Sequence, residues 1–165
     1  MSKKYLVSAL GNAIVDTLIL VEDSFLLENS VTKGSMTLIN KDTADQLSNL
    51  EYQKISSGGS ACNTVATISS LGKKCSFIGK VANDKFGEIF NTDLKESNCD
   101  FHLQYSNISN TTSKSFILVS KEDGERTMMT YLGYSSKIDQ IDDEDILQNS
   151  KIIYIEGYLW DKTET

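Results

Sequence analysis

The feature that most constrains this chain is a glycine pair, Gly58-Gly59, followed at once by helical periodicity over residues 61–72. Adjacent glycines permit positive φ angles and let another molecule approach the backbone closely. In the stretch that follows, apolar side chains recur at three- and four-residue spacing, which predicts a helix. A helix start carries unpaired N–H groups and the positive end of the helix dipole, so this junction is suited to a polar ligand.

Two polar residues stand in the first turn of the predicted helix, Ser60 with a hydroxyl and Asn63 with a carboxamide. Both groups form hydrogen bonds with hydroxyls. The loop and helix start therefore describe a pocket for a hydroxyl-rich small molecule. An ordinary tight turn with Ser60 as the helix N-cap fits the same residues equally well.

The surrounding pattern predicts an α/β fold with a parallel sheet. Apolar runs at residues 5–10 and 75–79 are typical of buried strands. Together with the helix between them they predict a βαβ unit. Residues 152–155 form another continuous apolar run and predict a further buried strand of the same sheet.

Three further helices are predicted from their starting residues. One begins near Asp42, and a second is capped by Asn83-Asp84 and ends where Asn98 would take a left-handed conformation. A third starts in the acidic stretch 139–145, where carboxylates favour a helix N-terminus.

The remaining apolar segments alternate with polar residues and predict a second, smaller sheet lying over the first. Residues 23–34 are polar and rich in turn formers, and residues 122–124 read as a hairpin turn. The predicted strands of the second sheet are residues 14–21, 36–39, 101–105, 115–120 and 126–132.

Composition restricts the classes of partner. A length of 165 residues suits one domain, and a net charge of −7 with a pI near 4.7 argues against a nucleic-acid partner. The sequence has no signal-peptide pattern and no run approaching the roughly 20 apolar residues of a membrane span. Cys62, Cys75 and Cys99 have no CxxC spacing, so we expect reduced, mostly buried thiols in a cytoplasmic protein.

Several motifs in order along the chain resemble the ribokinase-like (PfkB) family of sugar and nucleoside kinases. The stretch 58–66, Gly-Gly-Ser-Ala-Cys-Asn-Thr-Val-Ala, is similar to the family's first glycine-pair motif, and 77–87 continues as in family members. The stretch 11–16, Gly-Asn-Ala-Ile-Val-Asp, resembles the opening segment that supplies a substrate-binding aspartate. Residues 126–133 and 154–161 are similar to adenosine-kinase-like bacterial members.

The resemblance implies a ribokinase-like parallel sheet flanked by helices, with a small β-sheet lid formed within residues 14–39 and 101–132. It also implies a set of acceptor-binding residues. Asp16 would accept hydrogen bonds from sugar hydroxyls, Gly59 would let the sugar approach the backbone, and Tyr158 would stack on a nucleobase. The full expected set is Asn12, Asp16, Gly58, Gly59, Ser60, Asn63, Glu156 and Tyr158, with Met36 and Thr37 in the lid.

Two residues of this set have plainer interpretations. Asp16 alone would read as a solvent-facing acid on an edge strand, and Tyr158, like Trp160, as a core aromatic.

Family members transfer the γ-phosphoryl group of ATP with Mg²⁺, using an aspartate in a Gly-Ala-Gly-Asp type motif and a separate Asn-x-x-Glu motif. Neither motif, nor a Gly-x-x-x-x-Gly-Lys-[Ser/Thr] loop, occurs in the 165 residues. We therefore expect the N-terminal part of a kinase, with the acceptor-binding half present, the ATP-binding half absent, no catalytic base or metal site, and no turnover by the chain alone.

The acceptor is expected to be a small molecule, and a nucleoside such as adenosine is favoured over a free sugar such as ribose or fructose. The alternatives are a free-sugar kinase and a non-catalytic binding or assembly module derived from a kinase half, with a homodimer through the lid sheet. A dinucleotide-binding Rossmann domain is disfavoured because no Gly-x-Gly-x-x-Gly follows the first strand.

Overall fold

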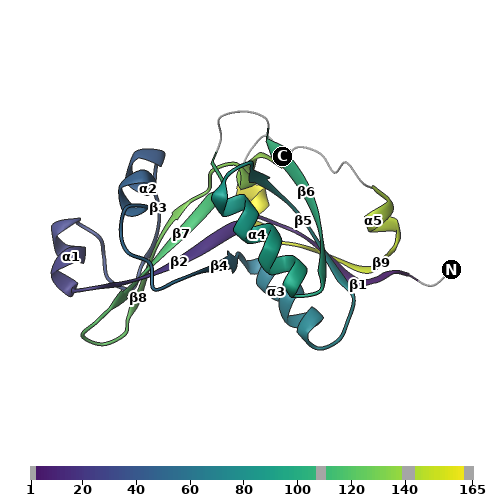
Figure 1. Ribbon diagram of the computed structural model, residues 1–165, viewed down its shortest axis with the longest axis horizontal. Coiled ribbons are helices and arrows are strands. Elements are labelled where there is room, and N and C mark those ends of the chain that lie inside the picture. Colours follow the sequence, from purple (N-terminus) through teal and green to yellow (C-terminus); the bar gives the residue numbers. More distant parts are fainter. Residues whose placement is uncertain (1–2, 107–110, 139–143, 162–165) are drawn as a thin grey trace.

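The computed structural model describes residues 3–106, 111–138 and 144–161. The described elements form two sheets, one of four strands and one of five. Figure 1 shows these sheets side by side along the long axis of the molecule, with helices α3 (Ser60–Ser70) and α4 (Lys85–Glu96) in front of the four-stranded one.

The four-stranded sheet is parallel throughout, with the order β6-β5-β1-β9. Its strands are β1 (Tyr5–Leu10), β5 (Cys75–Ala82), β6 (Cys99–Ser106) and β9 (Ser150–Ile155). Helices α3 and α4 cover one face, where the rings of Phe77, Phe90 and Phe101 pack with centroids 5.0–5.7 Å apart. The predicted βαβ unit is confirmed, since β1 and β5 are parallel neighbours and α3, which directly precedes β5, packs on both.

The second sheet has the order β3-β8-β7-β2-β4. It consists of β2 (Ile14–Val21), β3 (Met36–Leu38), β4 (Lys54–Gly58), β7 (Ser113–Ser120) and β8 (Arg126–Tyr131). Helices α1 (Asp23–Glu28) and α2 (Lys41–Leu47) pack on one face through Leu26 and Leu47. The predicted hairpin between β7 and β8 is confirmed, with Gly124 at φ +77° in the turn.

One prediction about these segments was wrong, and two elements, β4 and α1, were not predicted. Residues 101–105 belong to β6 of the parallel sheet, where they pair with β5, because Phe101 is needed in that core. Residues 54–58 form β4, whose serines and glycine gave no strand signal. Residues 23–28 form α1, a short helix held by the burial of Leu26 against the second sheet.

The ends of α4 follow the sequence prediction. The Asp84 side chain accepts a hydrogen bond from the Gly87 N–H at 2.8 Å, and Asn98 has φ +54°. The Asp84 carboxylate also accepts from the N–H and the hydroxyl of Thr112, which ties the start of α4 to the start of β7. Helix α5 (Glu144–Gln148) lies within the acidic stretch, while its predicted start at 139–143 lies outside the described residues.

The two strands predicted from continuous apolar runs differ in burial. Strand β5 is buried along its whole length, whereas Ile152, Ile153, Tyr154 and Ile155 in the edge strand β9 are 37–54% exposed. The prediction of a strand in β9 is confirmed, but its burial is not, because the described residues leave much of both faces of β9 uncovered.

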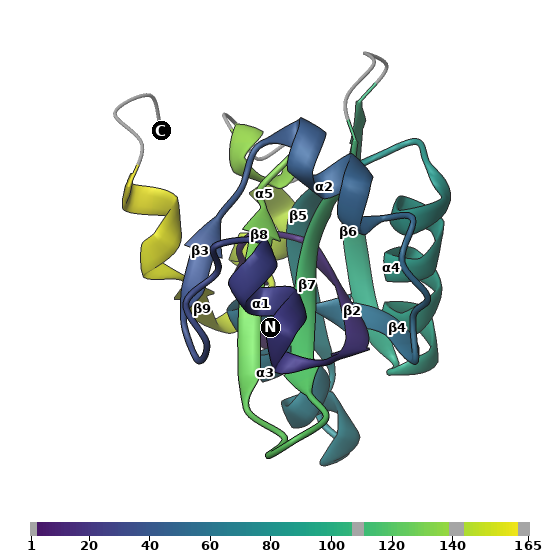
Figure 2. The ribbon, with the colours of Figure 1, turned by 90° about the vertical axis from the view of Figure 1, so that its left-hand side faces the viewer.

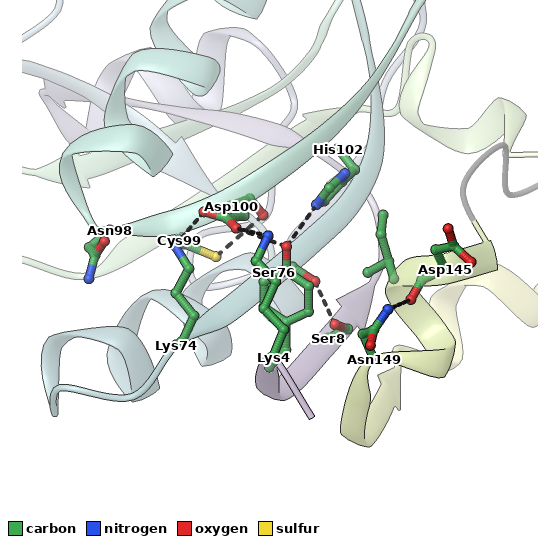
Figure 3. Close-up of polar contacts among 12 residues, drawn as sticks. Lys4, Ser8, Lys74, Ser76, Asn98, Cys99, Asp100, His102, Asp145 and Asn149 are labelled. Carbon is green, nitrogen blue, oxygen red and sulfur yellow. Dashed lines mark hydrogen bonds and ion pairs between the residues drawn. The ribbon is translucent and has the colours of Figure 1, made fainter. Parts of the chain in front are cut away.

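The face of the parallel sheet turned away from α3 carries paired polar side chains. Figure 3 shows Asp100 beside Lys4 and Lys74, and the hydroxyl of Tyr5 donates a 2.8 Å hydrogen bond to the same carboxylate. Burial alone would raise the pKa of Asp100, but the hydrogen bonds from Lys74, Tyr5 and Lys4 lower it to about 2. The contact between Tyr5 and Asp100 joins β1 to β6, so these side chains stabilise the sheet.

Within the described residues, no helix has the length and apolar character needed to cross a membrane. The three cysteines are free and buried, as expected.

Candidate acceptor site

A hollow of about 540 Å³ lies between the carboxyl end of the parallel sheet and the inner face of the second sheet. Its walls come from the loop after β1, the start of α3, strands β2, β3, β7 and β8, the 3₁₀ turn η1 (Ser135–Lys137) and the 3₁₀ turn η2 (Gly157–Asp161). Figure 2 shows η2, the yellow turn, at the left of the view, on the side where β3 is the edge strand of the second sheet. Ligands bind at the carboxyl ends of strands in open α/β sheets, so this is the expected place for a site.

The glycine pair has two separate structural roles. Gly59 has φ +98°, and a Cβ there would lie 2.6 Å from the backbone oxygen of Asn12, so any side chain is excluded. A Cβ on Gly58 would lie 2.2 Å from the Oδ2 atom of Asp16. The first glycine thus makes room for the Asp16 carboxylate, and the second allows the close turn into α3.

The interpretation of Ser60 as an N-cap is wrong. Gly59 is the N-cap of α3 and provides no side-chain cap. The Ser60 hydroxyl donates to Oε2 of Glu156 at 2.8 Å, and the Ala61 N–H donates to the same oxygen at 3.2 Å. A carboxylate from the end of β9 therefore replaces the missing cap at the positive end of the helix.

Glu156 is 3% exposed and both its oxygens are occupied. Oε1 accepts from the backbone N–H and from the side-chain Nδ2 of Asn12, each at 2.6 Å. The Oδ1 atom of Asn12 in turn accepts from the Ser135 hydroxyl at 3.0 Å. The polar atoms of Asn12 and Glu156 are thus engaged with each other and with the protein.

Asp16 and Asn63 have their polar atoms available. Both line the hollow, and the described part of the chain makes no hydrogen bond to the Asp16 carboxylate or the Asn63 carboxamide. Burial raises the pKa of Asp16 from its ordinary value of 3.8 to about 6, while the charge of Arg126 acts in the opposite direction. A half-buried acid without a donor is costly to the fold and well suited to an incoming hydroxyl.

The inner face of the second sheet is polar at one level and apolar at the next. Asp16, Ser115 and Thr130 are register partners across β2, β7 and β8, and the hydroxyls of Ser115 and Thr130 lie 3.1 Å apart. The next inward-facing row consists of the register partners Ile117, Met128 and Met36.

Most of the predicted site residues meet in this hollow. The ones that line it are Asn12, Asp16, Gly59, Ser60, Asn63, Glu156, Tyr158 and Met36. Gly58 lies behind Asp16, and Thr37 points to the other face of β3, as strand alternation requires.

The interpretation of Tyr158 and Trp160 as core aromatics is wrong, since they are 64% and 73% exposed. Several lining residues were not predicted from the sequence, including Ser115, Thr130 and Arg126. Strand alternation in β7 and β8 could have suggested them, but only the register across β2 brings them to Asp16.

The described ranges contain no group of three or more histidine, cysteine, aspartate or glutamate side chains able to hold a metal ion. The lining of the hollow combines side chains that can bind hydroxyls at one end with apolar side chains at the other.

Comparisons with known proteins agree with this arrangement. A sequence profile described as pfkB family carbohydrate kinase matches residues 28–165. Among curated proteins, a 5-dehydro-2-deoxygluconokinase of Clostridium perfringens is 36% identical over 107 residues, covering 61% of this chain and 30% of the relative. A probable fructokinase-5 of Arabidopsis thaliana is 30% identical over 100 residues, covering 59% and 31%.

Solved structures match nearly the whole fold. A probable sugar kinase from Rhizobium etli has a TM-score of 0.84 at 37% identity, covering 96% of this chain and 48% of its own. An adenosine kinase from Sinorhizobium meliloti has a TM-score of 0.82 at 40% identity, covering 96% and 49%. The chain thus spans about half the length of these structures and about 30% of the curated relatives.

Proposed function

Because the chain belongs to the pfkB family of carbohydrate kinases, we propose that it carries the acceptor-binding half of an enzyme that transfers the γ-phosphoryl group of ATP to a hydroxyl of a nucleoside, with adenosine as the favoured acceptor. The relatives named above act on sugars and on a nucleoside, so phosphoryl transfer to a small hydroxylated molecule is the shared theme.

The observation that carries the nucleoside proposal is the two-part character of the hollow. Asp16 and Asn63 offer hydrogen-bonding groups at the end nearest α3, and an apolar row with Met36 and Met128 continues along the second sheet. A free sugar is polar on all sides and would leave that row facing water. A nucleoside has a hydroxylated ribose and a flat, largely apolar base, which matches both parts.

The proposed roles follow from which polar atoms are available. The Asp16 carboxylate and the Asn63 carboxamide bind ribose hydroxyls, and Gly59 allows the ribose to lie against the backbone. Tyr158, exposed at the rim, stacks on the base. Because Asn12, Ser60 and Glu156 line the same hollow with their polar atoms already bonded to one another, they support these contacts.

The second sheet acts as a lid in this proposal. Its inner face supplies Met36 and forms one wall of the hollow, so movement of the sheet toward η2 would exclude water from the acceptor.

ATP and Mg²⁺ are the proposed co-substrate and metal. The described residues provide no cluster of metal-binding side chains, and the chain has none of the expected phosphate-binding motifs. We assign neither group to any residue of this chain. We further propose a cytoplasmic location and no phosphoryl transfer by the 165 residues alone.

Isothermal titration of the chain with adenosine, ribose and fructose tests the proposal. We expect heat of binding with adenosine, and a dissociation constant at least tenfold higher for ribose and fructose than for adenosine. Tighter binding of either sugar would contradict the nucleoside assignment. ATP-dependent phosphorylation of adenosine by the isolated chain would contradict the proposed lack of turnover.

A second candidate is an assembly module, favoured by the exposure of Met36 at 53% and Leu38 at 60% on the edge strand β3. Pairing through the second sheet would cover both side chains. Analytical ultracentrifugation distinguishes the two functions, because an assembly module forms a stable dimer and binds none of the three acceptors.

A further inference from the structure

The Glu156 carboxylate occupies an unusual place in the site. It comes from the residue after β9, yet its four hydrogen-bond donors belong to the loop after β1 and to the first turn of α3. None of the ion pairs found in the described residues involves it. Its charge is therefore balanced by N–H and O–H dipoles and by the start of a helix.

Space around this carboxylate is reserved by a glycine. A Cβ on Gly11 would lie 2.6 Å from Oε2 of Glu156 and 2.6 Å from the Cβ of Ala61. The loop after β1, the start of α3 and the end of β9 are thus packed at backbone contact distance around one buried side chain.

The hydrogen bonds continue beyond Glu156 to the second sheet. Asn12 Oδ1 accepts from the Ser135 hydroxyl, and the Ser113 hydroxyl at the start of β7 lies 2.6 Å from the same Ser135 oxygen. Ser113 is the residue at which β7 begins, and Asp16 lies two residues beyond its partner Ile14 on β2. A continuous series of hydrogen bonds therefore links Glu156, at the end of β9, to the start of β7 in the sheet that carries Asp16.

We propose that Glu156 is a positioning residue of the acceptor site and makes no direct contact with the acceptor. Its carboxylate fixes the start of α3, which carries Gly59 and Asn63. Through Asn12 and Ser135 it also fixes the start of β7 in the second sheet, which carries Asp16. This inference rests on the proposed function, because it assigns Glu156 a role in acceptor binding.

The reason for a carboxylate here is a matter of donors. Two backbone N–H groups, a carboxamide N–H and a hydroxyl all point at one buried position, and only a group with two acceptor oxygens serves all four. Glutamine would present an N–H₂ group to one pair of donors, either those of Asn12 or those of Ser60 and Ala61. Glu156→Gln therefore keeps the shape of the side chain and removes two of its four hydrogen bonds.

The test is a binding titration with the full chain. Adenosine and its 2′-, 3′- and 5′-deoxy analogues are titrated into the wild type, Glu156→Gln and Gly11→Ala, with Glu96→Gln, an exposed acid on α4, as the matched control. We expect Glu156→Gln and Gly11→Ala to weaken adenosine binding at least tenfold. Positioning predicts the same factor for every analogue, and Glu96→Gln should leave all affinities unchanged.

A direct contact would give a different pattern. One deoxy analogue, lacking the hydroxyl that Glu156 binds, would be insensitive to Glu156→Gln, and that result would overturn the proposal. An unchanged affinity in folded Glu156→Gln would overturn it as well, since the residue would then be merely structural.

Amide spectra separate failure of the inference from failure of the proposed function. In Glu156→Gln the N–H resonance of Asn12 or of Ala61, whichever one faces the new NH₂ group, should shift upfield and exchange faster with solvent, with or without acceptor. If the wild type bound no acceptor, the proposed function would fail. Unchanged amide resonances in the variant would refute the anchoring itself.

Discussion

The polar part of the hollow contains two carboxylates with opposite surroundings. Glu156 is almost fully buried and accepts four hydrogen bonds from the protein. Asp16, which lies on β2, accepts none from the described residues, and burial raises its pKa to about 6.

This difference separates an acid used by the fold from an acid kept for a ligand. Four donors around Glu156 recover what its desolvation costs, so the side chain holds its neighbours together. Asp16 is desolvated without that recovery, and its carboxylate gains partners only when hydroxyls enter. The two acids should therefore have opposite effects on stability when they are removed.

The largest effect is expected from Glu156→Ala, which leaves four donors without an acceptor. We expect the free energy of unfolding to fall by about 3 to 4 kcal/mol, since hydrogen bonds to charged groups contribute about 1.5–3 kcal/mol each and water partly replaces them. Urea denaturation measures the change, with Glu96→Ala on the exposed part of α4 as the matched control. A decrease in the free energy of unfolding below about 1 kcal/mol would contradict a stabilising role for Glu156 that Asp16 lacks.

Asp16→Asn should change stability in the opposite direction. The folded pKa of about 6 lies above the ordinary value of 3.8, so between these values the native state holds more protons than the unfolded chain. Wild-type stability should therefore fall as pH rises from about 4 to 6, and the full penalty is present above 6. At pH 7.5 we expect Asp16→Asn to be more stable by about 2 kcal/mol, from roughly 1.4 kcal/mol per pKa unit less the cost of a buried amide.

Urea denaturation of wild type and Asp16→Asn from pH 4 to 8 measures this difference. The stability gained by the variant should largely disappear as the pH approaches 4, because Asp16 is then protonated in the native state and partly protonated in the unfolded chain. A variant less stable than wild type at pH 7.5 would show that the carboxylate is satisfied by the fold, as Glu156 is.

Gly58→Ala tests whether the position of the Asp16 carboxylate matters. The new Cβ would lie 2.2 Å from Oδ2, so the carboxylate must move out of its place between β2 and β4. We expect adenosine binding to weaken about tenfold, equivalent to about 1.4 kcal/mol. The matched control is Gly157→Ala, where a Cβ meets nothing within 4 Å. Equal adenosine affinities of the two variants would show that the position of the Asp16 carboxylate does not matter for acceptor binding.

Local sequence signals were sufficient for the elements that frame the site. The glycine pair, the helical spacing after it and the apolar runs of β1 and β5 identified the βαβ unit, because each reports a local preference of the backbone or a buried face. The turn signal at Gly124 and the left-handed position of Asn98 were readable for the same reason.

Tertiary pairing decided what the local signals left open. Residues 101–105 alternate like a strand of either sheet, and only their pairing with β5 assigns them to the parallel one. The sequence also suggested Asp16, Asn12 and Glu156 together as acceptor contacts. It gave no means to see that Glu156 meets donors from positions 12, 60 and 61, about 95 to 144 residues away along the chain, and so differs from Asp16.

The smallest expected effect concerns the apolar row beyond Asp16, and it sharpens the contrast between the polar and apolar parts of the hollow. Met36 is 53% exposed, so Met36→Ala removes little packing from the fold, and we expect a stability change below about 0.5 kcal/mol. If the base of a nucleoside lies against this row, the variant loses part of that contact, and adenosine binding should weaken about two- to fivefold.

Ribose has no base, so its affinity should stay the same in Met36→Ala. Thr37→Ala is the matched control, because Thr37 lies on the same strand and points to the opposite face. Paired titrations of adenosine and ribose into both variants give the result. An equal loss for the two ligands would assign the sugar, and not the base, to the apolar part of the hollow.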